Sequence, residues 1–317
     1  HADKGDYTTV LMQGSGTFGV ESVLSGVISS TDKVLVLQNG AYSKRMVEMC
    51  DYHGIKYVVY EEDYAHVPAP AIVDDVLKSD GNITHISMVH SETTSGLLND
   101  IAAIGELAKK YNKKFIVDAM SSFGGVDINV PELGITYLVS SANKCIQGVP
   151  GFSFIIANVS DLKQTKGIAR SLSLDLYAQW ETMEKDGGKW RFTSPTHVVA
   201  AFSQALKELE AEGGVTARNA RYTATNRALR KGMEELGFKA YIDEAHQGPI
   251  ITTFFYPENC KFTFAKMYAY LKDHGYVIYP GKLTDAETFR LGNIGEIYMD
   301  DVEKILGIFK NFVSAEN

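Results

Sequence analysis

Cysteine and long apolar runs are scarce in this sequence. Its 317 residues contain three cysteines, at positions 50, 145 and 260, with no CxxC pair and no metal-binding spacing. A reducing, cytoplasmic setting is therefore expected. No apolar run approaches membrane-spanning length, and the start, HADKGDY, has neither the apolar stretch nor the basic lead of a signal peptide. These absences predict a protein without a membrane partner.

Positive charge is in short supply too. The chain has 31 Lys and Arg against 39 Asp and Glu, a formal net charge of −8. This balance argues against a general affinity for nucleic acid or for acidic membranes. An anionic substrate therefore needs a local positive site. What is present, 45% hydrophobic and 22% charged residues, is the composition of a globular protein.

Up to about residue 195, strand-like and helix-like segments alternate along the chain. Strands are expected at 7–12, 33–38, 55–61, 84–90, 113–119, 136–142 and 151–157. Helices are expected at 18–28, 42–53, after position 70 and at 100–111. This order predicts an α/β fold with a mainly parallel sheet covered by helices. Ligands of such sheets bind beyond the carboxyl ends of the strands.

The pattern changes near residue 195. Two long helical patterns follow at 197–212 and 216–236, then strands at 251–257, 276–281 and 288–293, and a last helix from about 299. A chain of this length suits two domains better than one. We therefore expect a large domain over 1–197 and a smaller α+β domain over 198–317.

A glycine-rich segment, GSGTFG at 14–19, follows the first expected strand. Glycines let the backbone turn sharply near a ligand, and the free N–H groups of a helix start favour a phosphate. The segment also fits G-x-G-x-x-G, the dinucleotide pattern, which needs an acidic residue at the end of the next strand. That strand ends in Gln38-Asn39-Gly40. A phosphate site is therefore favoured over a dinucleotide site or a purely structural turn.

Two residues lie at or just after the ends of neighbouring expected strands. Asp118 would project into the ligand crevice, although a helix cap or a solvated loop position is also open. Lys144 lies among small residues in SSANKCIQG, where partial burial would lower its pKa and make the amine nucleophilic; a surface lysine is the plainer interpretation. An anion cradle, an acid and an amine together are what pyridoxal phosphate requires.

Arg290 lies inside the apolar run TFRLGN. An arginine there is expensive to bury unless it meets an anion. The sequence therefore indicates a substrate anion site, with a structural ion pair as the alternative.

Seven stretches carry a resemblance to known enzymes: YTTVLMQGSGTFGVE, NGAYSKRM, HSETTSGLLNDI, FIVDAMSSFGG, SSANKCIQG, WRFTSP and YPGKLTDAETFRLGNIGEI. With them the chain resembles fold-type I pyridoxal-phosphate enzymes of the alanine–glyoxylate and serine–pyruvate aminotransferase group. More narrowly, it looks like the 2-aminoethylphosphonate–pyruvate transaminases. The stretches run from residue 7 to about 296, nearly the whole chain.

The resemblance implies roles for the residues singled out above. Lys144 matches the lysine that bonds to the cofactor, and Asp118 matches the acid beside its pyridine nitrogen. Ser15, Gly16 and Thr17 match the phosphate loop. A transaminase that uses pyridoxal 5'-phosphate is therefore expected.

Four more positions match residues around the cofactor ring. Tyr42 lies where the group places an aromatic ring over the cofactor, and Met120 is expected to pack on the other face. Thr93 matches a hydroxyl residue near the phenolic oxygen, and Asn143 adjoins the lysine.

The resemblance also implies a partner subunit and a substrate. Trp190 and Thr193 match a segment that reaches the cofactor phosphate of the neighbouring subunit, which implies a homodimer with shared active sites. Arg290 matches the arginine that binds the substrate anion, a phosphonate or the carboxylate of pyruvate. The implied reaction converts 2-aminoethylphosphonate and pyruvate into phosphonoacetaldehyde and alanine. In one departure, the group carries a longer segment before the first strand, and we expect that segment to be absent here.

Several alternatives stay open at this stage. An alanine or serine aminotransferase of the same group would share the arginine and the cofactor site. A cysteine desulfurase would need a reactive cysteine, for which Cys260 in YPENCKF is a poor candidate. A nicotinamide-dependent oxidoreductase would explain the glycine-rich segment but leave Lys144 without a role. A protein that keeps the fold without catalysis would not need the matched positions intact.

Overall fold

The computed structural model describes residues 6–258, 260–281, 283 and 287–316. Most of the HADKGDY start, and positions 282 and 284–286 of the YPGKLTDAETFRLG stretch, lie outside these residues. The expectation about a signal peptide therefore falls outside them as well.

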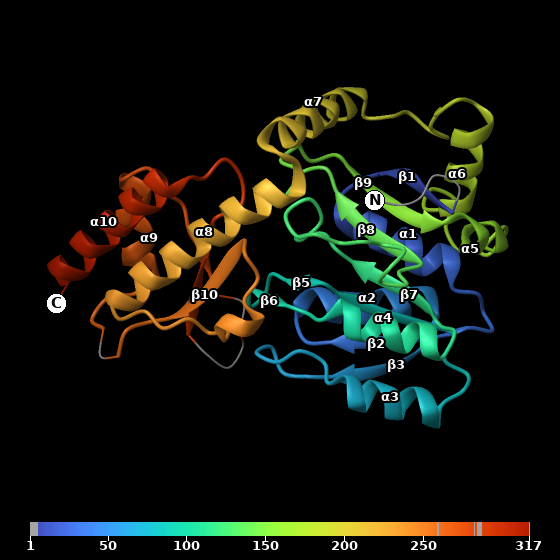
Figure 1. The fold of residues 1–317 in the computed structure, drawn as a ribbon, viewed down its shortest axis with the longest axis horizontal. Helices are drawn as coiled ribbons and strands as arrows, with labels where there is room; N and C mark the ends of the chain where they lie inside the picture. Colours follow the sequence, from blue (N-terminus) through green and yellow to red (C-terminus); the bar gives the residue numbers. More distant parts are fainter. Residues whose placement is uncertain (1–5, 259, 282, 284–286, 317) are drawn as a thin grey trace.

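A seven-stranded sheet organises the first half of the chain, in the order β1-β9-β8-β7-β4-β2-β3 (Figure 1). Its strands are β1 (Tyr7–Gln13), β2 (Lys33–Gln38), β3 (Lys56–Glu61), β4 (His85–Val89), β7 (Lys114–Asp118), β8 (Tyr137–Ser141) and β9 (Phe152–Asn158). Strand β9 pairs antiparallel with both β8 and β1, and the other pairings are parallel. The predicted mainly parallel sheet is confirmed.

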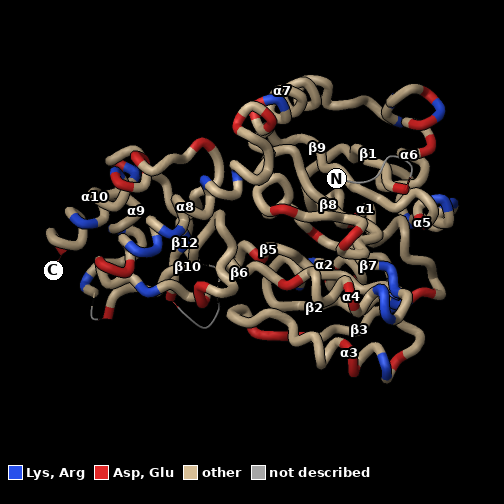
Figure 2. The backbone as a smooth tube through the Cα atoms, viewed as in Figure 1, with Lys and Arg blue, Asp and Glu red and all other residues tan. Residues whose placement is uncertain are grey.

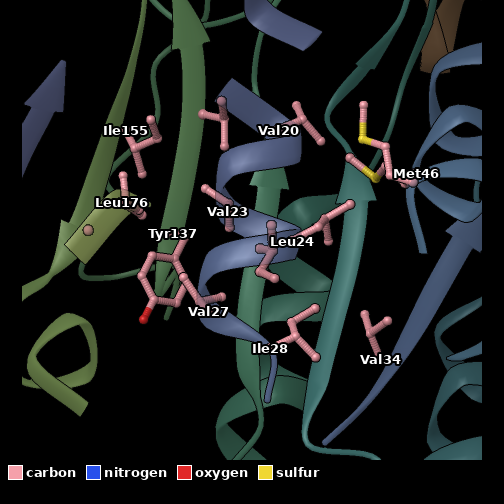
Figure 3. Close-up of a cluster of buried hydrophobic side chains, with 14 of the residues drawn as sticks. Val20, Val23, Leu24, Val27, Ile28, Val34, Met46, Tyr137, Ile155 and Leu176 are labelled. Atoms are coloured by element: carbon pink, nitrogen blue, oxygen red, sulfur yellow. The ribbon is translucent and has the colours of Figure 1, made fainter. Parts of the chain in front are cut away.

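Helices cover both faces of this sheet because its central strands are apolar on both sides. Along β2, Val34 and Val36 join the core under α1, α2 and α6, whereas Leu35 and Leu37 join the core under α3 and α4. Figure 3 shows the first of these cores around α1. The helices are α1 (Gly16–Val27), α2 (Ala41–His53), α3 (Pro70–Ser79), α4 (Ile101–Lys110), α5 (Val159–Gln164) and α6 (Leu176–Lys185).

The C-terminal part lies beside the sheet and has its own apolar core (Figure 1). A three-stranded antiparallel sheet, in the order β10-β12-β11, packs against helices. The elements are α7 (Thr196–Glu212), α8 (Gly214–Glu235), the 3-10 helix η1 (Glu244–His246), β10 (Ile251–Phe255), α9 (Phe264–Asp273), β11 (Tyr279–Pro280), β12 (Thr288–Gly292) and α10 (Met299–Glu316). The predicted domain boundary after residue 197 falls at the start of α7 and stays a prediction.

Some elements differ from the sequence-based expectation. Helix α1 begins at Gly16, not at 18, because the extended Ser15 is already its N-cap. The expected strand at 276–281 is reduced to the two residues of β11, and Val277 is 62% exposed, unlike a strand residue in a core. Helices α5, α6 and α9, and the two-residue strands β5 (Ser91–Glu92) and β6 (Leu97–Leu98), were not expected.

Charge and hydropathy complete the outline. Figure 2 shows acidic and basic residues interspersed along both parts of the chain. Within the described residues, none of the helices is long and apolar enough to span a membrane.

Candidate active site

A cavity of about 510 Å³ lies at the carboxyl edge of the large sheet. The segments that follow β1, β2, β4, β7 and β8 line it, because these strands run in one direction and end at the same edge. Its volume is in the range of small-molecule sites. Nine predicted site residues line this cavity: Ser15, Gly16, Thr17, Tyr42, Thr93, Asp118, Met120, Asn143 and Lys144.

The glycine-rich segment forms the turn from β1 into α1. Gly14 has a φ of +113°, a conformation that favours glycine, and its N–H donates to the Gly151 carbonyl at 3.1 Å. A Cβ atom at Gly16 would lie 2.3 Å from Met120 Sδ, so glycine is required for this approach. The Ser15 side chain makes no capping bond, and the first turn of α1 has no acidic residue. The N–H groups at this helix start are therefore open to an anion.

Asp118 ends β7 as a buried carboxyl group. Burial raises the pKa of Asp118 to about 7; a hydrogen bond from the Met120 N–H, at 2.9 Å, opposes this rise, and the nearby charge of Glu92 adds to it. A cation that faces such a group favours its ionised form. The site therefore suits a ligand that brings a positive ring N–H to Asp118.

Lys144 lies in the turn after β8 and is half-buried at the cavity. The turn is held from two sides. The Gly148 N–H donates to the Ala142 carbonyl at 2.9 Å, and the buried Arg218 guanidinium donates to the Cys145 carbonyl at 2.8 Å. The Lys144 amine is thus carried by a fixed segment, and its charge acts on Asp118 across the cavity.

Helix α2 brings two side chains to the cavity, Tyr42 and Arg45. The Arg45 guanidinium lies over the Tyr42 ring, 5.0 Å from its centroid, and Nη1 donates to Thr17 Oγ1 at 3.3 Å. Arg45 therefore connects the predicted stacking ring with the predicted phosphate loop. The sequence argument quoted the stretch NGAYSKRM but did not select Arg45; its place one turn after Tyr42 was the available signal.

Arg290 does not line this cavity, yet it adjoins it. The residue lies in β12 with 7% of its surface exposed. Its Nη1 donates to the Thr93 carbonyl at 2.9 Å and its Nε to the Pro280 carbonyl at 3.2 Å. Backbone carbonyls, not a carboxylate, thus hold the guanidinium beside a residue of the cavity wall.

Trp190 and Thr193 lie apart from the cavity within this chain. Trp190 lines a neighbouring cavity of about 390 Å³, which shares Gly14 with the first one, and it packs edge-to-face on Phe152. Thr193 is exposed. Their predicted contribution to a partner's site stays a prediction.

One further wall residue was missed by the sequence argument. Ser91 is buried at the cavity, and its Oγ has no hydrogen-bond partner. It directly follows His90 after the end of β4, so its place at the carboxyl edge was the signal. An unsatisfied buried hydroxyl is costly, which makes Ser91 a candidate partner for a bound polar group.

The residues present fit pyridoxal phosphate. An uncapped helix start suits its phosphate, the buried Asp118 suits its ring nitrogen, and Lys144 offers an amine for its aldehyde. Gln38, at the end of β2, lies where a dinucleotide site would place an acid. The donor set therefore matches the predicted cofactor better than a dinucleotide.

Comparison of the sequence with known proteins agrees with this site. The family model for class-V aminotransferases matches residues 3–283. The 2-aminoethylphosphonate–pyruvate transaminase of Lysinibacillus sphaericus is 53% identical over 315 residues, 99% of this chain and 86% of that protein. A bifunctional phosphonoacetaldehyde hydrolase/aminoethylphosphonate transaminase of Clostridioides difficile is 56% identical over 308 residues, 97% of this chain. The chain spans about half of that relative, 48% of its length.

Solved structures share the fold. Pyridoxamine–pyruvate aminotransferase from Mesorhizobium loti superposes with a TM-score of 0.88 at 25% identity, over 96% of this chain and 80% of that one. Alanine–glyoxylate aminotransferase from Nostoc sp. gives a TM-score of 0.89 at 20% identity, over 97% and 82%, and by itself shows the fold alone. The predicted fold-type I architecture is confirmed. Together with the family match, these comparisons show that the chain belongs to the class-V aminotransferases, whose cofactor is pyridoxal phosphate.

Proposed function

We propose that this protein transfers the amino group of 2-aminoethylphosphonate to pyruvate, giving phosphonoacetaldehyde and alanine. The observation that carries the chemistry is the meeting of Asp118, Lys144 and an uncapped helix start in one cavity. The substrate assignment is supported by the names of the relatives that share more than half of this sequence.

The chain's own residues divide the work at the cofactor. The N–H groups at the start of α1 bind the phosphate. Tyr42 and Met120 bound the ring from α2 and from the turn after β7. Asp118, as a carboxylate, holds the proton on the ring nitrogen. Bound there, the cofactor supplies an aldehyde for amines and a ring that accepts electrons.

Lys144 supplies the amine that attaches the cofactor and then serves as the proton carrier. Its Nζ takes a proton from the substrate carbon that bears the amino group. The held turn from Ala142 to Gly148 keeps this nitrogen in place for the transfer. Pyruvate receives the amino group through the reverse proton movement at the same Nζ.

Two guanidinium groups provide the local positive charge that an acidic chain needs for anionic substrates. Arg290 is held beside Thr93 by two carbonyls, which leaves other N–H donors of its fork for a phosphonate or a carboxylate. Arg45 lies on the opposite side of Tyr42's helix turn, by the phosphate loop. We assign Arg290 to the substrate anion.

We further propose a homodimer in the cytoplasm, with each site completed by the partner. Apolar side chains are exposed next to the cavity that Trp190 lines: Phe18 is 50%, Phe192 51% and Leu172 77% exposed. Exposed apolar groups gathered in one place mark interaction sites. A second copy there would bring its own Trp190 and Thr193 towards the phosphate loop. The division into domains 1–197 and 198–317 belongs to the same proposal.

The test is a half-reaction followed by spectroscopy. The protein is loaded with pyridoxal phosphate, and 2-aminoethylphosphonate is added without any keto acid. We expect the absorbance of the enzyme-bound cofactor to give way to that of its aminated form, and pyruvate to restore the starting spectrum.

Other outcomes separate the parts of the proposal. Conversion by alanine or serine but not by 2-aminoethylphosphonate would overturn the substrate and leave the aminotransferase standing. No spectral change on adding the cofactor, in a protein that is folded by circular dichroism, would overturn the assigned site. The matched variant Lys144→Ala is expected to bind the cofactor weakly and to show no half-reaction.

A further inference from the structure

Glu92 is a fully buried acidic residue beside the active site that the proposed mechanism does not use. It ends the short strand β5 and has no exposed surface. Burial raises its pKa, and hydrogen bonds from Thr94, Ser43 and Tyr42 act against this rise. A buried carboxyl group is costly unless its partners favour it, so the nature of those partners decides what it does.

Both oxygens of Glu92 accept hydrogen bonds. Oε1 accepts from Thr94 Oγ1 at 2.6 Å and from the Thr94 N–H at 3.2 Å. Oε2 accepts from the Ser43 N–H at 3.3 Å and from Ser43 Oγ at 3.4 Å. The Ala41 N–H donates to Thr94 Oγ1, so the hydroxyl hydrogen is free for Glu92. All these groups donate, which is the pattern a carboxylate satisfies and a protonated acid does not.

The donors on one side belong to the first turn of α2. This helix has no cap of its own, since its N-cap is Gly40 and no acidic residue lies in its first turn. Helix starts leave N–H groups without partners and favour negative charge. Glu92 supplies both from another strand, 49 residues away from Ser43.

Gly40 leaves the space that this arrangement requires. A Cβ atom there would lie 2.2 Å from the Glu92 carboxyl carbon. The approach of the carboxylate to the helix start is therefore built into the sequence at two distant positions, 40 and 92. A second residue type is specified for the same contact.

The same carboxylate touches both parts of the site. On one side it holds the turn of α2 that carries Tyr42 and Arg45 into the cavity. On the other side it holds Thr94, and the intervening Thr93 offers its carbonyl to Arg290. Its charge also acts on the neighbouring site groups Asp118 and Arg290.

We propose that Glu92 is a positioning residue that sets the stacking ring on α2 and the substrate arginine in register across the cavity. The role rests on the proposed function only for the arginine. For the ring it needs nothing beyond the bound cofactor. An acid that merely filled a structural gap would not be expected to change the cofactor's surroundings.

The test is Glu92→Gln in the cofactor-loaded enzyme. An amide group turns one acceptor into a donor, which then faces donors on α2 or on Thr94. Because a lost helix cap is worth about 2- to 30-fold in an equilibrium constant, we expect the Kd for pyridoxal phosphate to rise by that factor. The circular dichroism of the bound cofactor should weaken, and KM for the acidic substrate should rise more than kcat falls.

Asp161→Asn is the matched control. Asp161 is a partly buried acid on α5 that pairs with Lys114 at the start of β7, whereas the site lies at the end of that strand. This variant is expected to lose stability with no change in the Kd or dichroism of the cofactor. Glu92→Asp, which keeps the charge, should recover part of the cofactor affinity.

If Glu92→Gln fails to fold, Thr94→Val removes the donor to Oε1 and leaves the carboxylate in place. It should give the same cofactor changes in weaker form. Cofactor Kd and dichroism that equal those of Asp161→Asn would overturn the proposal. Since both are measured without substrate, they test Glu92 even if 2-aminoethylphosphonate is not the amino donor.

Discussion

Asp118→Asn is expected to stabilise the cofactor-free protein at pH 8 and to have little effect near pH 4. The pKa of Asp118 lies at about 7 in the folded protein, against an ordinary 3.8. Folding therefore favours the protonated acid, and stability falls as pH rises from about 4 through 7. At about 1.36 kcal/mol per pH unit, the difference between 3.8 and about 7 amounts to about 4 kcal/mol. Asparagine has the same shape, does not ionise and avoids this loss.

The assay is urea unfolding of both proteins without cofactor, at several pH values from 4 to 8. The quantity of interest is the difference in unfolding free energy, because every other titrating group cancels. Asp74→Asn serves as the control of opposite sign. Hydrogen bonds from Lys110, Lys78 and Tyr111 hold the pKa of Asp74 below its ordinary value. That variant should lose stability above pH 4.

Cofactor reverses the order of the two proteins. With pyridoxal phosphate bound, the Asp118 carboxylate faces a positive ring nitrogen, so the wild type should gain more stability on loading than Asp118→Asn. A pH-independent difference in the cofactor-free state would refute the reasoning, because it would mean that Asp118 is already ionised or already paired there. A larger gain by the variant on loading would refute the assigned role.

Three further predictions rest on other contacts. Arg290→Lys keeps the charge but not the fork that holds both carbonyls, and it should raise KM for phosphonate by about 10-fold or more in steady-state assays. Glu212→Gln should cost about 3 kcal/mol in urea unfolding at pH 7, because two arginines of α8, one of them fully buried, lose their acid. Burial opposes the effect, but hydrogen bonds from these arginines set the pKa of Glu212 below 4.5, so wild type and variant should converge below about pH 4. Burial raises the pKa of Cys50 and of Cys145 to about 12, so a thiol reagent should titrate only Cys260 in the native protein and all three cysteines after unfolding.

Local patterns in the sequence were enough to predict most elements of the large sheet. Short apolar runs and the helices between them specify strands and helices through side-chain periodicity, which acts over a few residues. The order of these elements also indicates which edge of the sheet holds the ligand, because parallel strands share one direction. For this reason residues as distant as Ser15 and Lys144 could be expected in one cavity.

Other elements escaped because their cause is not periodic. Helix α5 starts directly at the end of β9, where Asn158 caps it, so no loop separates strand from helix. The segment at 276–281 is apolar enough for a strand, yet only β11 pairs, as an edge of the small sheet. The resemblance supplied the roles of single residues, and those roles stay predictions.

By itself, the sequence determined the succession of elements, the glycine-rich turn, and the acid and the amine at the strand ends, since each depends on neighbours along the chain. Only the tertiary structure decided how these parts are held. It places Glu92 on the start of α2, Arg45 beside Thr17, and Arg290 on the carbonyl of Thr93, 197 residues away. Such contacts join segments that meet only after the sheet has formed, and a hydrogen bond across that distance leaves no local pattern to read.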